Sequence, residues 1–176
     1  MLTEKFYAGI GSREVNDSVG TNIRYIAEVL EHNRYTLRTG GAEGCDQYAQ
    51  SGVEHSAQIW LPWATYNKGI REEYPDHKYM ILSEGDKEAW ESVEKFHPNP
   101  TALSRGARAL HARNYRILVG KTYPNSEFVV CWTRDGKDSG GSGQLIRTAN
   151  FLKIPVYNLF NMSREAVLEA IEKNHF

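Results

Sequence analysis

The sequence lacks an excess of charge of either sign. Its 176 residues carry 21 Lys and Arg against 22 Asp and Glu, for a formal net charge of −1. A long nucleic acid is held mainly through its phosphates, so a protein that binds one usually carries a basic surplus. The balance excludes a bulk positive field and disfavours a duplex-binding protein, although it leaves a local basic patch open.

Long apolar runs and cysteines are also scarce. No stretch has the length of a membrane span, and no charged-then-apolar leader opens the sequence. The two cysteines, Cys45 and Cys131, lie in a turn and in an apolar run. We therefore expect a cytoplasmic protein with free thiols and no membrane partner. The length predicts a single domain over residues 1–176.

Metal-ligand spacings and standard nucleotide fingerprints are absent as well. The six histidines show no paired spacing, and two isolated cysteines make no zinc knuckle. A dinucleotide fingerprint beginning at Gly9 needs glycine where Glu14 stands, and a P-loop ending at residues 120–122 needs glycine where Tyr115 stands. We expect no metal and no cofactor, and neither NAD chemistry nor Mg-ATP hydrolysis.

What the sequence does contain is a regular alternation of strand and helix patterns. Apolar runs typical of buried strands occupy residues 6–10, 35–38, 57–61, 127–132 and 154–158. Helical spacing follows from Asp17 or Ser18, from Asp46 to about His55, over residues 144–152, and after Ser163. The alternation predicts an α/β fold, a doubly wound, Rossmann-like, mainly parallel five-stranded sheet with helices on both faces.

One segment, residues 63–100, interrupts the alternation with polar and aromatic residues. A short helix near residues 86–96 is the one element expected in it. A connection this long is seldom bare loop, so we interpret it as a lid or rim over a site.

A helix is predicted after this segment, from the N-cap type Asn99 and the first-turn residue Pro100 to about Val119. Asn114 falls on its apolar face, where an amide either ties down a neighbouring loop or points at a ligand. Four arginines, at positions 105, 108, 113 and 116, are expected on the solvated face. Arg113, beside Asn114, is equally open to a ligand role.

Three strand ends carry glycine-rich turns, at residues 9–13, 40–44 and 140–143. Parallel strands of a doubly wound sheet end at the same edge, so the three turns are expected to open on one side. Glycine turns followed by helix N-termini are suited to binding phosphate. The convergence predicts a phosphate or nucleotide site at the carboxyl edge of the sheet.

Several side chains near these turns allow two interpretations. Cys45, at a helix start, is a candidate nucleophile, but we favour a small packed residue. Trp60, Trp63 and Trp132 lie near strand ends, where core or rim packing is favoured over base stacking. Asp46 either contacts a sugar or stabilises the first turn of its helix, and the sequence leaves both readings equal.

The turn sequences together resemble the SLOG superfamily of Rossmann-like proteins, which includes DNA-processing protein A and the Lonely Guy phosphoribohydrolases. The resemblance covers residues 6–158. Its most specific part is Gly-Gly-Ala-Glu-Gly-Cys-Asp at 40–46, which is similar to the glycine box of DNA-processing protein A. Shorter pieces at 61–63, 112–114 and 130–133 look like small stand-alone members of the kind often carried by bacteriophages, which implies the host cytoplasm if the protein is phage-encoded. Such a resemblance implies a nucleotide-type ligand and self-association into a homo-oligomer.

The resemblance also implies a set of site residues. Asp46, and less so Glu43 or Asp135, are the candidate catalytic carboxylates, and no residue is assigned to a metal. The candidate ligand residues are Gly11, Ser12, Arg13, Arg38, Gly40, Gly41, Ala42, Gly44, Arg113, Asn114, Trp132, Thr133, Gly140, Gly141, Ser142, Gly143 and Gln144.

Our leading hypothesis from the sequence is a hydrolase that cleaves an N-glycosidic bond in a nucleoside monophosphate or related ribosyl nucleotide. The run Gly-Gln-Leu-Ile-Arg at 143–147 lacks the acidic residues of Lonely Guy enzymes at that place. A non-catalytic sensor or sequestering protein for a nucleotide-derived signal is the first alternative. Binding of single-stranded DNA, as in DNA-processing protein A, is the second and less favoured one.

Overall fold

The computed structural model describes residues 4–176, and across them six strands alternate with seven α-helices and one 3-10 helix. The strands are β1 Lys5–Gly11, β2 Tyr35–Thr39, β3 Ala57–Leu61, β4 Lys78–Ile81, β5 Val129–Trp132 and β6 Val156–Asn158. The helices are α1 Asp17–His32, α2 Cys45–Ser51, α3 Lys68–Glu73, α4 Lys87–Phe96, α5 Arg105–Leu118, α6 Gly143–Phe151 and α7 Arg164–His175, with the 3-10 helix at Pro100–Ala102.

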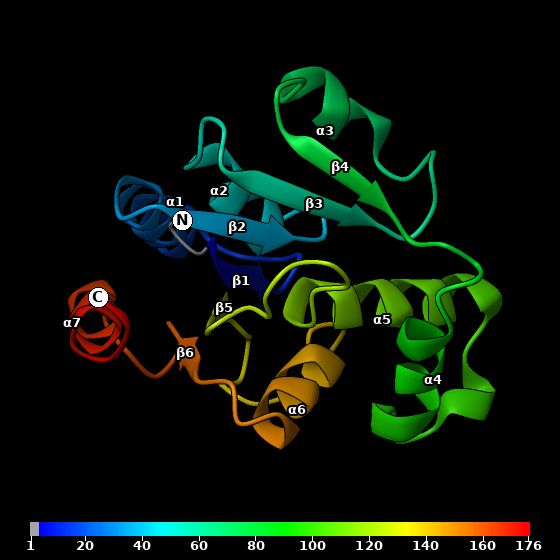
Figure 1. Ribbon diagram of the computed structural model, residues 1–176. Helices are drawn as coiled ribbons and strands as arrows, with labels where there is room; N and C mark the ends of the chain where they lie inside the picture. Colours follow the sequence, from blue (N-terminus) through cyan, green and yellow to red (C-terminus); the bar gives the residue numbers. More distant parts are fainter. Residues whose placement is uncertain (1–3) are drawn as a thin grey trace.

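All strand pairs are parallel, and the sheet order is β4-β3-β2-β1-β5-β6. The chain runs outward from β1 through β2 to one edge and then returns to the other side of β1 with β5 (Figure 1). The doubly wound Rossmann-like fold predicted from the sequence is confirmed. Its switch point, where ligands of such sheets usually bind, lies between β1 and β5.

The sheet has six strands instead of the predicted five because β4 forms inside residues 63–100. Only four residues long, β4 has exposed ends at Lys78 and Ile81 and lies at the edge of the sheet, beside β3. A half-exposed edge strand lacks the continuous apolar run of a buried parallel strand, so its sequence gave little signal.

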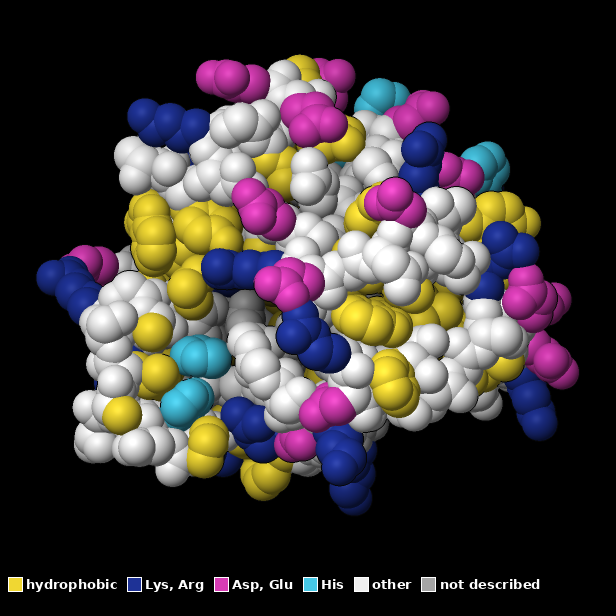
Figure 2. All heavy atoms as spheres, turned by 180° about the vertical axis from the view of Figure 1, so that it is seen from behind, with side chains coloured by type: hydrophobic (Ala, Val, Ile, Leu, Met, Phe, Trp, Pro, Cys, Tyr) yellow, Lys and Arg dark blue, Asp and Glu magenta, His cyan; other side chains and the backbone are white. Residues whose placement is uncertain are grey.

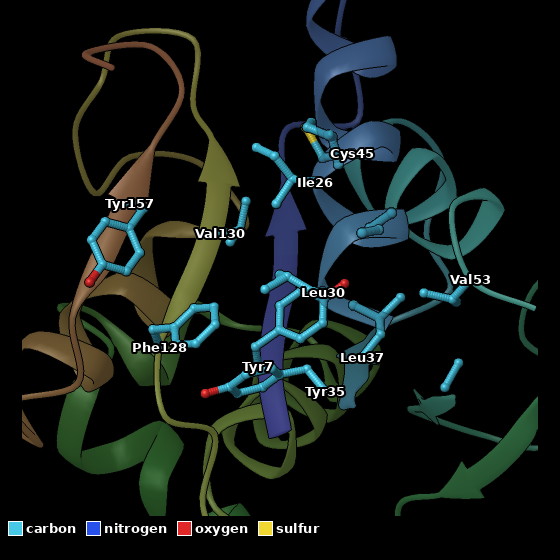
Figure 3. Packing of buried hydrophobic residues seen from close by; sticks show 14 of the residues in the cluster. Tyr7, Ile26, Leu30, Tyr35, Leu37, Cys45, Val53, Phe128, Val130 and Tyr157 are labelled. Atoms are coloured by element: carbon cyan, nitrogen blue, oxygen red, sulfur yellow. The ribbon is translucent and has the colours of Figure 1, made fainter. Parts of the chain in front are cut away.

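The two faces of the sheet have different cores. Helices α1, α2 and α7 cover one face, where strand residues such as Tyr7, Leu37 and Val130 belong to the same core as Leu30 (Figure 3). Helices α5 and α6 cover the other face, with α4 packed against them (Figure 1). Successive side chains of a strand point to opposite faces, so β1 serves both cores.

The predicted helix from Asn99 was wrong in its start. Pro100–Ala102 form a single 3-10 turn, and Leu103 is extended before α5 begins at Arg105. The side chain of Ser104 accepts a hydrogen bond from the backbone N–H of Ala107 and is the true N-cap. Serine is as good an N-cap as asparagine, and the helix begins after the later of the two residues. Likewise α2 ends at Ser51, ahead of the expected His55.

The later part of residues 63–100 is anchored to α5 by a buried ion pair. The Arg116 guanidinium donates to both carboxylate oxygens of Asp86, at 2.7 and 2.6 Å, and to Glu88 at 2.8 Å. Hydrogen bonds from Arg116 lower the pKa of Asp86, which also caps α4 through the Ala89 N–H. Bidentate pairs of this kind fix geometry strongly. None of the helices in residues 4–176 combines the length and apolarity that a membrane crossing requires.

Candidate functional site

A cleft of about 620 Å³ lies at the carboxyl edge of the sheet, at the switch point between β1 and β5. The loops after β1 and β5, the start of α6 and one side of α5 line it. Of the residues expected from the sequence, the structure brings together Gly11, Ser12, Arg13, Ala42, Asp46, Arg113, Asn114, Thr133, Gly140, Gly141 and Ser142. The lining residues that sequence reasoning missed are Ile10, Glu14, Ala107, Leu110, His111, Arg134, Ser139 and Leu145.

The floor of the cleft requires glycine at position 11. The backbone N–H of Ser12 donates to the Trp132 carbonyl at 3.0 Å, which joins the ends of β1 and β5. A Cβ on Gly11 would lie 2.5 Å from that carbonyl oxygen and 2.6 Å from Cys45 Sγ. Burial raises the pKa of the Cys45 thiol to about 12. Cys45 is therefore a packed thiol at neutral pH, as favoured from the sequence.

The 40–44 turn, between β2 and α2, is filled by side chains from α2 and α5. Asp46 Oδ2 accepts from the backbone N–H groups of Gly40, at 3.0 Å, and Ala42, at 3.4 Å. Arg113 Nη1 donates to the carbonyls of Gly40 and of Trp60, the latter at 2.9 Å. Burial raises the pKa of Asp46, while Arg113 and the two N–H groups oppose the rise. These contacts occupy the polar groups of the 40–44 turn that could otherwise bind a ligand.

Helix α5 presents two of its arginines to the interior, contrary to the solvated face expected. Arg113 and Arg116 are buried, whereas Arg105 is exposed. The small residues Ala109 and Ala112 lie on the same buried side and let α5 approach α4 and the sheet closely. The arginine stems then fill space while their guanidinium groups reach carbonyls or Asp86. Asn114 is half-buried, and its side chain has no hydrogen-bond partner within residues 4–176.

The 140–143 turn, before α6, is open by contrast. A Cβ added to Gly140 or Gly141 would meet no atom within 4 Å. Ser142 is the N-cap of the nine-residue α6, but its side chain makes no capping hydrogen bond. The N–H of Gly143 donates to the Gly140 carbonyl at 3.1 Å, while the next N–H groups of α6 have no side-chain acceptor among the described residues at the wall of the cleft. Unpaired N–H groups at the positive end of a helix dipole favour an anion there.

Two arginines stand at the mouth of the cleft. Arg13 is exposed and has no hydrogen bond or ion pair from its side chain in the described part of the chain. Arg134 pairs with Glu14, which links the loops after β5 and β1. Both partners are largely exposed, at 69% and 80% of their side chains, so the pair contributes little to stability and exchanges readily.

His111 is a cleft residue with a strongly lowered pKa. Its ring lies 4.9 Å, centroid to centroid, from that of His97, and its buried Nδ1 has no partner among the described residues. Burial and the neighbours His97, Arg147 and Arg113 lower the pKa of His111 to about 4. His111 has no regular spacing to another histidine, so its sequence pattern did not indicate that it lines the cleft.

Several expected site residues do not line the cleft, and Arg38 is the clearest correction. It is 1% exposed inside the sheet, with its guanidinium 3.8 Å from the Phe6 ring centroid and bonded to Gln58 Oε1 and the Pro124 carbonyl. Glu43 lies on a separate shallow surface, and Asp135 accepts from Lys137 N–H and Ser139 Oγ. The remaining residues outside the lining are Gly40, Gly41, Gly44, Trp132, Gly143 and Gln144.

Comparison with known proteins places the fold. No protein-family profile matches the sequence, and no curated protein matches it in sequence. Among solved structures the fold is similar to that of DNA processing protein A from Helicobacter pylori, described by its single-stranded DNA binding mode. Their TM-score is 0.70 at 17% identity, covering 99% of this chain and 83% of that one. DNA processing protein A from Streptococcus pneumoniae gives a TM-score of 0.53 at 16% identity, covering 89% and 50%.

The class that fold and cleft define is therefore a Rossmann-like protein with its cleft at the switch point of a parallel sheet. Within that class, the fold of the described residues is similar to that of DNA processing protein A.

Proposed function

We propose that this protein binds single-stranded DNA and holds one of its phosphates in the cleft between β1 and β5. One arrangement carries the proposal: the open 140–143 turn and the uncapped start of α6 share the cleft with Arg13, a cation without an anionic partner in the described chain. Backbone N–H groups and a free guanidinium are the usual ligands of a phosphate. The similar fold of a protein known for binding single-stranded DNA supports the choice of ligand.

The carboxylates near the cleft favour binding over hydrolysis. N-glycosidic cleavage needs a carboxylate beside the sugar. Asp46 already accepts two backbone N–H groups, Glu14 pairs with Arg134, and Asp135 accepts from its own loop. The nucleotide hydrolase inferred from the sequence stays a prediction, with Asp46 as its catalytic carboxylate.

The charge of the protein sets the expected character of binding. The net charge is −1, and the face in Figure 2 has Lys and Arg interspersed with Asp and Glu, without a continuous basic block. We expect few phosphate contacts, so log Kd should change with log salt by about 0.7 per phosphate held, for one or two phosphates in all.

Recognition of a free nucleotide is the second candidate. The cleft volume of about 620 Å³ falls within the range of roughly 300–1,000 Å³ common for small-ligand sites. A sensor or sequestering protein would use the same phosphate contacts but gain nothing from a longer strand.

Fluorescence anisotropy with labelled oligothymidylate tests the proposal. Arg13→Ala should weaken binding by about tenfold, because one charge-assisted phosphate contact is lost. Arg24→Ala, an exposed arginine on α1, is the matched control and should bind as the wild type does. Unchanged affinity in Arg13→Ala would contradict the proposal. Release of free base from nucleoside monophosphates, read by mass spectrometry, would restore the hydrolase.

A further inference from the structure

A row of rings leads away from the cleft along the junction of α4 and α6. We call it the α4–α6 strip and define it as His111, His97, Phe96, Phe151 and Lys95. The ring centroids of His97 and His111 are 4.9 Å apart, and those of Phe96 and Phe151 are 5.3 Å apart. His97 follows Phe96 directly in the chain, so the two ring pairs are neighbours at the end of α4.

The outer end of the strip is exposed and carries a cation. Phe151 is 60% exposed, and Lys95 Nζ lies 4.3 Å from its ring centroid and 5.1 Å from that of Phe96. Scattered exposed apolar side chains are ordinary on a protein surface. Two contiguous rings beneath a lysine, as in Phe96, Phe151 and Lys95, are less common. Figure 2 shows two adjacent histidine side chains on this face, with Lys or Arg and hydrophobic side chains next to them.

The carboxylates around the strip are already paired. Glu94 pairs with Arg108, and Asp138 lies 3.7 Å from Arg147. Lys95 has no carboxylate partner within residues 4–176. The strip therefore keeps one uncompensated positive charge at its exposed end.

The strip is joined to the cleft at two points. His111 lines the cleft directly. Arg147 donates to the Asp138 carbonyl at 2.8 Å and to the Phe96 carbonyl at 3.4 Å, which ties the loop at the cleft wall to the end of α4. A strand held by a phosphate in the cleft would thus find the strip next to it.

We propose that the α4–α6 strip is a stacking platform for the bases of single-stranded nucleic acid that extends beyond the phosphate in the cleft. The inference rests on the proposed function and adds the path that the strand takes. Aromatic rings beside a cation stack any base and attract the backbone, so binding along the strip is independent of sequence.

A strand suits the strip better than a second copy of the chain does. Stable self-association generally requires about 800 Å² buried on each partner with an apolar core. The strip is narrow, partly formed by histidines, and carries an unpaired lysine that a like surface on a second copy would repel. A polyanion removes that repulsion.

The test measures how affinity depends on strand length, with thymidine monophosphate and oligothymidylates of about two to eight nucleotides as probes. In the wild type, affinity should rise with length. Phe151→Ala should weaken the longest oligomer by about tenfold and leave the monophosphate unchanged, because one stacked base is lost. Lys95→Gln, an exposed change that spares the fold, should weaken the long oligomer in the same direction and reduce its salt dependence.

Tyr25→Ala is the matched control, since Tyr25 is 44% exposed on α1 with Arg164 4.5 Å from its ring. It should retain the length dependence of the wild type. Long-strand affinity that survives both Phe151→Ala and Lys95→Gln overturns the platform while leaving the cleft proposal intact. Loss of a dimer in sedimentation, without a change in binding, assigns the strip to self-association and also overturns it. Absence of binding by every probe removes the proposed function itself.

Discussion

The 40–44 and 140–143 turns lie at the same edge of one sheet and are built in opposite ways. In the first, Asp46 accepts from Gly40 and Ala42 while Arg113 donates to the Gly40 carbonyl, so protein groups satisfy the turn. In the second, no atom stands within 4 Å of a Cβ placed on Gly140 or Gly141. Glycine serves close packing throughout the first turn, whereas in the second Gly140 and Gly141 leave open space and only Gly143 is packed, against the Asp138 carbonyl.

The difference teaches that a distinctive glycine motif is no direct pointer to a ligand. A glycine turn stays available to an anion only if the protein leaves its N–H groups unpaired. The 40–44 turn carries the most specific part of the family resemblance, and two of its N–H groups, those of Gly40 and Ala42, already donate to Asp46. In the 140–143 turn the Gly143 N–H donates to the Gly140 carbonyl at 3.1 Å, and no side chain of the described residues accepts from the N–H groups of the turn.

Replacing Asp46 beside the 40–44 turn should have the largest effect on stability. Asp46→Ala leaves two buried N–H groups without an acceptor and takes the nearest negative charge from buried Arg113. We expect a loss of about 3 kcal/mol in the free energy of unfolding, measured by urea denaturation. Glu43→Ala, an exposed change in the same turn, should keep the midpoint of the wild type. Similar midpoints for both variants would mean that the turn needs no internal support.

A glycine-to-alanine substitution in each turn tests the same comparison, with a smaller expected effect on stability. Gly44 has φ of 78°, and its Cβ would lie 2.3 Å from the Arg13 carbonyl oxygen. Gly44→Ala should therefore cost about 2 kcal/mol of stability, from backbone strain and overpacking. Gly141→Ala should unfold near the wild-type temperature, since nothing surrounds its Cβ. Calorimetry of the two variants measures the contrast, and equal shifts would refute it.

The smallest expected effect concerns His111, on the cleft side. Its folded pKa of about 4 lies below the ordinary 6.5, so between these values the unfolded chain binds more protons. The free energy of unfolding should thus rise as the pH is raised from about 4 to 6.5. The expected change is on the order of 1 kcal/mol after allowance for the partial exposure of the ring. His111→Gln should flatten this slope in urea denaturation across that pH range. His55→Gln, on an exposed histidine, should leave it steep, and a steep slope in both variants would exclude His111 as its source.

Much of the fold could be predicted because it depends on local pattern. The alternation of apolar runs with helical spacing specified five of the six strands and a doubly wound, mainly parallel sheet. Strand β4 was not predicted, because an exposed edge strand of four residues lacks that pattern. For the cleft, the turns after β1 and β5 were predictable from glycine and strand position. His111 and Arg134 were not, because neighbours far away in sequence bring them there.

The sequence by itself determined a doubly wound sheet whose glycine turns meet at one edge, since strand periodicity and parallel winding require no knowledge of long-range contacts. Only the tertiary structure decided which turn stays open. Asp46 and Arg113, 67 positions apart by their numbers (113 − 46), close the first turn, and Arg116 with Asp86 fixes the helix that carries Arg113. Burial and ionic pairing of this kind arise from packing between distant segments, and no local pattern encodes them.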